Sequence, residues 1–113
     1  MTRCMNLNIE WTPIALQSLS DVFEYTFEEF GERQVRKLTS QIYKVVRRLS
    51  AFPMIGELDE ECTKEFGVEY RHIVVISQIS LMYTIVDDTV YIEYVRNARL
   101  DDSTVWDKMS YMF

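Results

Sequence analysis

The stretch "VEYRHIVVISQISLMYTIVDDTVYIEYVRNARLDD", residues 68–102, decides the fold class of this 113-residue chain. Apolar and polar residues alternate over three segments, at about residues 67–76, 79–86 and 89–97, which is the period of half-buried strands. The breaks between them are short, "SQ" at 77–78 and "DD" at 87–88. Neighbouring strands are therefore predicted to pair as antiparallel hairpins in a three-stranded meander.

A helix is predicted to begin at "WTP", with Thr12 as its N-cap and Pro13 at the first helical position. At 100° per residue its apolar side chains share one face, opposite a face of acidic side chains, and Gly31 is a natural end. The apolar face, expected to pack in the core, comprises Leu16, Leu19, Phe23, Phe27 and Phe30.

A second helix is predicted from Glu32 to the segment "AFPMIGEL", where Pro53 cannot continue it. Its apolar stripe comprises Val35, Leu38, Ile42, Val45, Val46 and Leu49. The other side of this helix is basic and comprises Arg33, Arg36, Lys37, Lys44, Arg47 and Arg48. An acidic and a basic amphipathic helix joined by a tight turn predict an antiparallel helical hairpin packed on another layer.

Three shorter segments complete the predicted order of elements. "NLNIE", residues 6–10, is a short strand, and "DEECTKE", residues 59–65, is a solvated charged loop rather than a cation site. The C-terminal "DDSTVWDKMSYMF" is a short helix beginning near Asp102 or Ser103. We therefore expect one α+β domain over residues 1–113, in which a two-helix hairpin covers one face of a small antiparallel sheet.

Composition excludes several classes of protein. The net charge of −6 disfavours non-specific binding of nucleic acid or of an anionic membrane. No apolar run approaches the roughly 18 residues that cross a bilayer, so the chain is expected to be cytoplasmic. Cys4 and Cys62 match no motif, and His72 is the single histidine. No metal site and no cofactor are predicted.

Basic residues nevertheless lie on the predicted sheet. Arg71 and Arg96 each fall near a strand end, and Arg99 follows the last strand. The planar guanidinium group suits phosphates and carboxylates, because it donates two parallel hydrogen bonds. The alternative is pairing with local acids such as Glu69, Glu93 or Asp101. Tyr83 is expected to pack in the sheet rather than stack on a base, and His72 is expected to be a satisfied, half-buried side chain rather than a general base.

The order of elements, with "EYRHIVV", "LMYTIVDDTVYIEYV" and "RNARLD", resembles the RelE/ParE superfamily of toxins from bacterial type II toxin–antitoxin systems, which includes plasmid stabilisation proteins. The resemblance covers nearly the whole chain, from "IEWTPIALQSLSDVFEYTFEEFG" onward. It implies a helical hairpin on a small sheet, and a toxin silenced by a cognate antitoxin that wraps it.

The resemblance implies one of two activities. RelE-like members cut messenger RNA on the ribosome with basic residues and no metal, whereas ParE-like members inhibit DNA gyrase. Ser80 and Ile73 stand where RelE-like nucleases carry an arginine and a lysine, and Trp106 stands near the position of a tyrosine. We therefore expect a ParE-like inhibitor. A ribosome-dependent RNase using Arg71, Arg96 and Arg99, or an inactive member kept for antitoxin binding, remains the alternative.

Two binding surfaces are predicted on this basis. The target, either DNA gyrase or the ribosome with messenger RNA, is expected to contact Arg71, Tyr83, Arg96 and Arg99. The antitoxin is expected to contact Arg36, Lys37, Lys44 and Arg47 on the second helix, whose alternative role is a solvated face. Pairing of two copies of the chain is left open.

Overall fold

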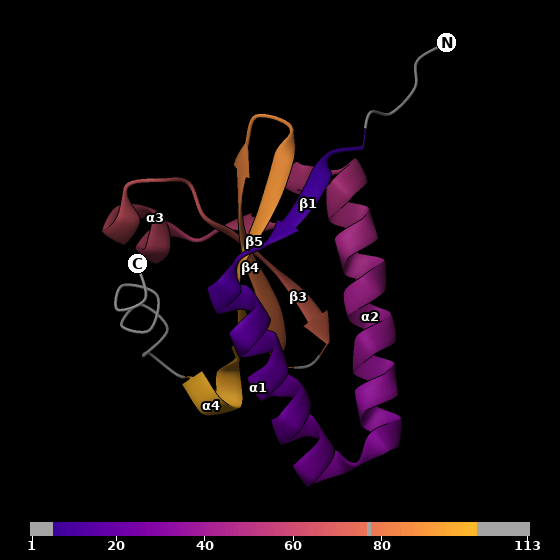
Figure 1. Ribbon diagram of the computed structural model, residues 1–113. Coiled ribbons are helices and arrows are strands. Elements are labelled where there is room, and N and C mark those ends of the chain that lie inside the picture. The colour runs from indigo at the N-terminus through magenta and orange to yellow at the C-terminus, as the bar shows by residue number, and fades with distance from the viewer. Residues whose placement is uncertain (1–5, 77, 102–113) are drawn as a thin grey trace.

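The computed structural model describes residues 6–76 and 78–101 of the chain. Its strands form one five-stranded sheet in the order β1-β5-β4-β3-β2 (Figure 1). The strands are β1 (Asn8–Trp11), β2 (Glu57–Leu58), β3 (Arg71–Ile76), β4 (Ile79–Val86) and β5 (Thr89–Asn97). The helices are α1 (Pro13–Phe30), α2 (Glu32–Ala51), α3 (Glu60–Phe66) and α4 (Ala98–Asp101), with a 3-10 turn η1 (Pro53–Ile55).

The predicted meander is confirmed, and so is the α+β class. β4 and β5 have the predicted bounds, β3 begins at Arg71 rather than at residue 67, and β4 pairs antiparallel with both neighbours. The sheet as a whole is mixed rather than antiparallel, because β1 runs parallel to β5, with Trp11 opposite Ile92. The chain passes through both long helices between β1 and the meander, so no hairpin turn sets the direction of β1.

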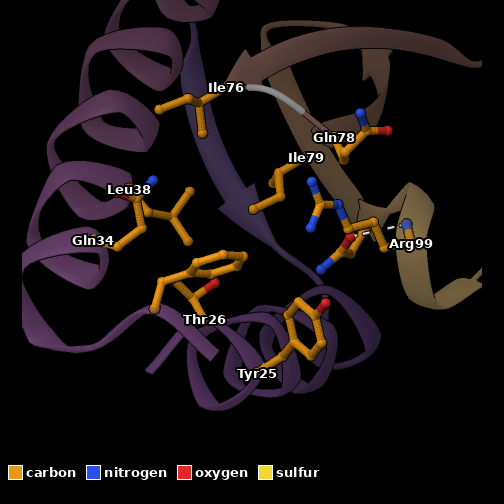
Figure 2. A pocket seen from close by; sticks show the side chains of 10 residues that line it. Tyr25, Thr26, Gln34, Leu38, Ile76, Gln78, Ile79 and Arg99 are labelled. Atoms are coloured by element: carbon orange, nitrogen blue, oxygen red, sulfur yellow. Dashed lines mark hydrogen bonds between the residues drawn. The ribbon is translucent and has the colours of Figure 1, made fainter. Parts of the chain in front are cut away.

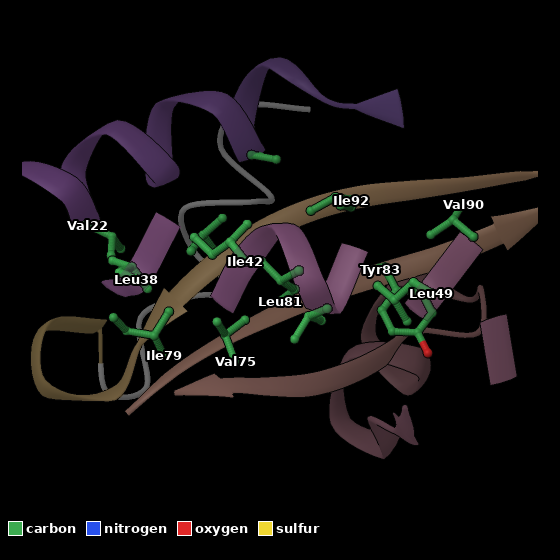
Figure 3. Packing of buried hydrophobic residues seen from close by; sticks show 13 residues of the cluster. Val22, Leu38, Ile42, Leu49, Val75, Ile79, Leu81, Tyr83, Val90 and Ile92 are labelled. Carbon is green, nitrogen blue, oxygen red and sulfur yellow. The ribbon is translucent and has the colours of Figure 1, made fainter. Parts of the chain in front are cut away.

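The predicted stripe of α2 forms the centre of the core (Figure 3). Leu38 is 1% exposed and Leu49 is fully buried, and Ile42 and Val45 are also buried. They pack on side chains from one face of the sheet, among them Leu81, Tyr83, Val90 and Ile92. The hairpin-on-sheet arrangement and the burial of Leu38 and Ile42 are therefore confirmed.

The predicted core face of α1 was right only in part: Leu19 and Phe23 are partly buried against the core, but the fully buried side chains lie about a quarter turn away. The buried residues are Ile14, Ala15, Ser18, Val22 and Thr26. Leu16, Phe27 and Phe30 are 53%, 59% and 56% exposed. The reason is the close approach of α1 to β5, where the Ser18 hydroxyl accepts a hydrogen bond of 2.9 Å from the Val95 N–H. Small side chains on this face of α1 permit the close approach, and the bulky side chains lie outside the contact.

A β-bulge changes which side chains of β5 share a face. Met82 pairs with Tyr94, but the next residue, Tyr83, pairs with Ile92, so Glu93 is an extra residue in β5. Simple alternation predicts that Ile92, Tyr94 and Arg96 share a face. The bulge reverses the alternation, and Tyr94 packs with Met82 on the face away from the helical hairpin.

The predicted charged loop at residues 59–65 was also wrong, because this segment forms α3. The Asp59 side chain caps its start by accepting a hydrogen bond of 3.0 Å from the Cys62 N–H, and Gly67 ends it in the left-handed conformation. Cys62 is buried with Tyr70 against the second face of the sheet. Both faces are thus covered in part, whereas the expected layout covered only one.

The end of the described chain differs from expectation as well. A single helical turn, α4, follows β5 directly. The helix predicted from Asp102 or Ser103 lies outside the described residues.

Candidate functional site

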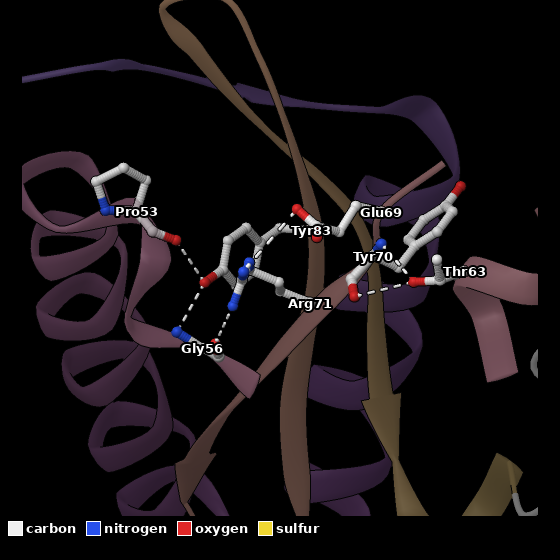
Figure 4. A network of polar contacts seen from close by, with 7 residues as sticks. All are labelled: Pro53, Gly56, Thr63, Glu69, Tyr70, Arg71 and Tyr83. Carbon is white, nitrogen blue, oxygen red and sulfur yellow. Dashed lines mark hydrogen bonds and ion pairs between the residues drawn. The ribbon is translucent and has the colours of Figure 1, made fainter. Parts of the chain in front are cut away.

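Arg71 and Tyr83 lie opposite each other on β3 and β4 and hold the segment that follows α2 (Figure 4). The Tyr83 hydroxyl donates a hydrogen bond of 2.7 Å to the Pro53 carbonyl and accepts one of 2.9 Å from the Gly56 N–H. Arg71 Nη1 donates a hydrogen bond of 2.8 Å to the Gly56 carbonyl. These contacts fasten η1 and β2 to the edge of the sheet.

Gly56 is required by this close packing rather than by its backbone angles. A Cβ atom at this position would lie 2.5 Å from the Tyr83 hydroxyl oxygen and 2.8 Å from the His72 carbonyl oxygen. The sequence shows this glycine only as a permissive turn residue after Pro53. Its contact with Tyr83 is 27 residues away along the chain, and no local pattern indicates it.

Arg71 and Tyr83, two of the residues predicted to contact a target, have little or no exposed surface. The Arg71 side chain is 15% exposed and lies 3.9 Å from Glu69 Oε1, one of the acids named as its alternative partner. Tyr83 has no exposed surface, and burial raises the pKa of its hydroxyl. In this conformation Tyr83 offers no surface to a target. Any effect of Tyr83 on binding must pass through Gly56 and the segment it holds.

Arg96 lies on the other face of the sheet, in a half-buried position opposite Ser80. Its charge lowers the pKa of the nearby Cys62 thiol, but burial dominates and raises that pKa to about 12. A thiol with such a pKa is protonated near neutral pH, so Cys62 is a core residue rather than a nucleophile. Burial also raises the pKa of Glu93, although a hydrogen bond of 2.8 Å from the Thr84 hydroxyl opposes this shift.

Arg99 lies at a pocket of about 310 Å³ between the turn of the helical hairpin and the end of β5 (Figure 2). The Arg99 guanidinium lies 5.9 Å from the centre of the Phe30 ring, and the Arg99 N–H donates a hydrogen bond of 3.0 Å to Asn97 Oδ1. The pocket is lined by Tyr25, Thr26, Phe30, Gln34, Leu38, Ile76, Gln78, Ile79, Asn97 and Arg99.

The residues predicted to bind a target do not converge on one site. Arg71 shares the hairpin face with Tyr83, Arg96 projects from the opposite face, and Arg99 lies beyond the end of β5. Ile73 packs against the core and Ser80 is buried, so neither adds a polar group to a common surface. The sequence places these residues near strand ends but does not show that the β5 bulge separates them.

The four residues predicted to bind an antitoxin do share a surface. Arg36, Lys37, Lys44 and Arg47 are all exposed on the side of α2 away from its buried stripe. Arg36 Nη2 lies 2.8 Å from Glu32 Oε2, and the Arg47 guanidinium lies 5.7 Å from the centre of the Tyr43 ring. The geometry leaves this basic face open to a partner, and antitoxin binding there stays a prediction.

His72 is half-buried beside two carboxylates, with which it forms ion pairs only when its imidazole is protonated. Its Nε2 lies 3.6 Å from Glu57 Oε1 and its Nδ1 lies 3.5 Å from Asp59 Oδ2. Over residues 6–76 and 78–101 no three His, Cys, Asp or Glu side chains are arranged to hold a metal ion. Within that same part of the chain, no helix has the length and apolar character needed to span a bilayer.

Comparison with known proteins gives a family match and similar solved structures. Residues 9–101 match the family model described as the ParE toxin of the type II toxin–antitoxin system parDE. No curated protein sequence matches the chain. A solved structure described as "Chromosomal ParDE TA system from P. aeruginosa" is similar with a TM-score of 0.65 and 16% identity, over 84% of this chain and 98% of that chain. At this identity the likeness supports the fold alone.

Proposed function

The chain belongs to the family of ParE toxins of type II toxin–antitoxin systems, and from this premise we propose that it arrests bacterial growth by binding DNA gyrase and is neutralised by a cognate antitoxin. The match over residues 9–101 supports the toxin role, because it covers both long helices and all five strands except Asn8. Gyrase is proposed as the target because ParE-like members of the superfamily inhibit it.

The separation of Arg71 from Arg96 favours a binding inhibitor over a nuclease. Cleavage of RNA without a metal requires several cations around one phosphate, together with an acid and a base. Arg71 and Arg96 project from opposite faces of the sheet, and Arg71 is held by Gly56. Among the residues that the structure describes, these arginines therefore form no common phosphate site. An inhibitor that works by occupying a surface needs no such cluster.

The basic face of α2 supports antitoxin binding at the helical hairpin. Its four predicted residues are exposed, and the buried stripe of α2 fixes them on the outside of the molecule. An acidic segment of a partner, helical or extended, would meet complementary charge along this face.

Growth under induced expression tests the toxin assignment. We expect induction of this chain alone to arrest a bacterial host, and co-expression of its cognate antitoxin to restore growth. The Arg99→Gln variant is expected to weaken the arrest at equal protein level. Lys64→Gln, which removes an exposed charge from α3, is the matched control. Normal growth with soluble, folded protein would contradict the proposal and favour an inactive family member.

A further inference from the structure

The pocket beside Arg99 combines an apolar floor with polar groups at its edge. Leu38, Ile76 and Ile79 supply the floor, and the amide side chains of Gln34 and Gln78 stand at its edge (Figure 2). Its size lies at the lower end of the range of ligand sites in proteins. Among the described residues that line the pocket none is a carboxylate, and Arg99 is the one that carries a formal charge.

Arg99 is positioned to receive an anion. Its guanidinium packs against the Phe30 ring at 5.9 Å, which orients the group and leaves N–H donors for a forked contact. Within the described ranges no ion pair joins Arg99 to a carboxylate of this chain. A guanidinium in this setting offers donors from which a carboxylate can accept two hydrogen bonds.

We propose that this pocket binds a peptide segment of a partner protein in which an aromatic or branched apolar residue stands next to an acidic residue. The apolar side chain fills the space over Leu38 and Ile79, and the neighbouring carboxylate pairs with Arg99. Affinity then comes from burial of the apolar group, and selectivity comes from the charge-assisted hydrogen bonds.

The surface around the pocket favours a peptide over a small free acid. Phe27 and Phe30 are 59% and 56% exposed on α1, and Phe30 is also part of the pocket wall. A peptide chain that leaves the pocket covers this adjoining apolar surface, whereas a small molecule leaves it in water. The inference rests on the proposed function in one respect, since it takes the antitoxin as the source of the peptide.

The test is NMR titration of the full-length 15N-labelled protein with defined probes. One probe is the peptide acetyl-Gly-Ser-Phe-Asp-Ser-Gly-amide, and its matched probe carries Asn in place of Asp. A third is N-acetylphenylalanine, which offers a free acid without a peptide. We expect saturable shifts at Gln34, Ile79 and Arg99 with the Asp peptide, and about tenfold weaker binding of the Asn peptide, from the loss of one charged hydrogen bond.

Two variants locate the binding. Arg99→Gln is expected to bind both peptides equally weakly, and Gln34→Phe is expected to fill the pocket and abolish binding, while Lys64→Gln binds as the parent does. Equal affinity for the two peptides in the parent, or shifts from the free acid alone, would overturn the peptide assignment. Shifts of the same residues on raising the protein concentration alone would indicate a second copy as the occupant. None of these outcomes depends on growth arrest. Failure of the peptide-binding proposal can therefore be distinguished from failure of the proposed toxin function.

Discussion

At the scale of single residues, Gly56 is the position that the packing constrains most tightly. We predict that Gly56→Ala lowers the free energy of unfolding by about 1–3 kcal/mol, because its Cβ would lie 2.5 Å from the Tyr83 hydroxyl oxygen. Urea unfolding measures the change. An alanine variant as stable as the parent would show that η1 and β2 do not lie so close to Tyr83.

Tyr83 itself is predicted to support the fold rather than touch a target. Tyr83→Phe leaves the Pro53 carbonyl and the Gly56 N–H without their partner. We expect it to cost about 1–3 kcal/mol of stability. Toxicity measured at equal levels of folded protein should not change. A loss of activity without a loss of stability would restore the original prediction that Tyr83 contacts the target directly.

The half-buried carboxyl of Glu93 predicts a dependence of stability on pH. Burial raises the pKa of Glu93, so the folded chain holds this proton more tightly than the unfolded chain does. Its contribution to stability is therefore complete below the unfolded pKa, about 4.3 for a glutamate, and is lost as pH rises through the folded pKa. Glu93→Gln keeps an acceptor for the Thr84 hydroxyl.

We therefore expect Glu93→Gln to raise the urea midpoint at pH 7 and to leave it unchanged near pH 4. Glu24→Gln, at an exposed position on α1, is the matched control and should change neither midpoint. An equal rise at both pH values would mean that packing, and not the buried charge, limits stability at Glu93.

At the scale of elements, one pair of substitutions tests how each long helix faces the sheet. Leu38→Ala in α2 should cost about 2–5 kcal/mol, because the side chain is 1% exposed in the core. Leu16→Ala in α1 removes the same atoms at a position that is 53% exposed, and should cost less than about 1 kcal/mol. Similar losses of stability in the two variants would instead support the core face that the sequence predicts for α1.

The elements that the sequence predicts well carry their own local signals. Thr12 and Pro13 mark the start of α1, and the Thr12 hydroxyl does accept a hydrogen bond of 3.0 Å from the Ala15 N–H. The breaks at 77–78 and 87–88 place β4 and β5 between correct bounds. In α2 one apolar stripe faces one basic face, so periodicity alone identifies its buried side.

The elements that the sequence misses depend on tertiary contacts. α1 has two candidate faces, one bulky and one of small residues, and the choice depends on the hydrogen bond from Val95 to Ser18 across 77 residues. The two-residue strand β2 exists because Glu57 and Leu58 pair with β3. Glu93 gives no sign of a bulge in the sequence. The prediction of the candidate site is affected most, because the bulge determines on which face of the sheet Arg96 lies.

At the scale of the whole molecule, the charge layout predicts how an antitoxin binds. Reversing two exposed charges of α2, as in Arg36→Glu with Arg47→Glu, should weaken binding of the antitoxin by about tenfold at low salt and reduce its salt dependence. Lys64→Glu on α3 is the control. Calorimetric titration at two salt concentrations measures both effects. Unchanged affinity and salt slope would mean that the partner docks on another surface.

The arrangement of the arginines supports inhibition by binding, and supercoiling of plasmid DNA by purified gyrase tests this most directly. Supercoiling is measured while the purified chain is titrated in, beside a translating system in which messenger RNA cleavage is followed. The proposed function predicts dose-dependent loss of supercoiling with intact messenger RNA, weakened by Arg99→Gln and unchanged by Lys64→Gln. Unimpaired supercoiling, with codon-specific cuts that Arg99→Gln abolishes, would contradict it and establish the ribosome-dependent RNase.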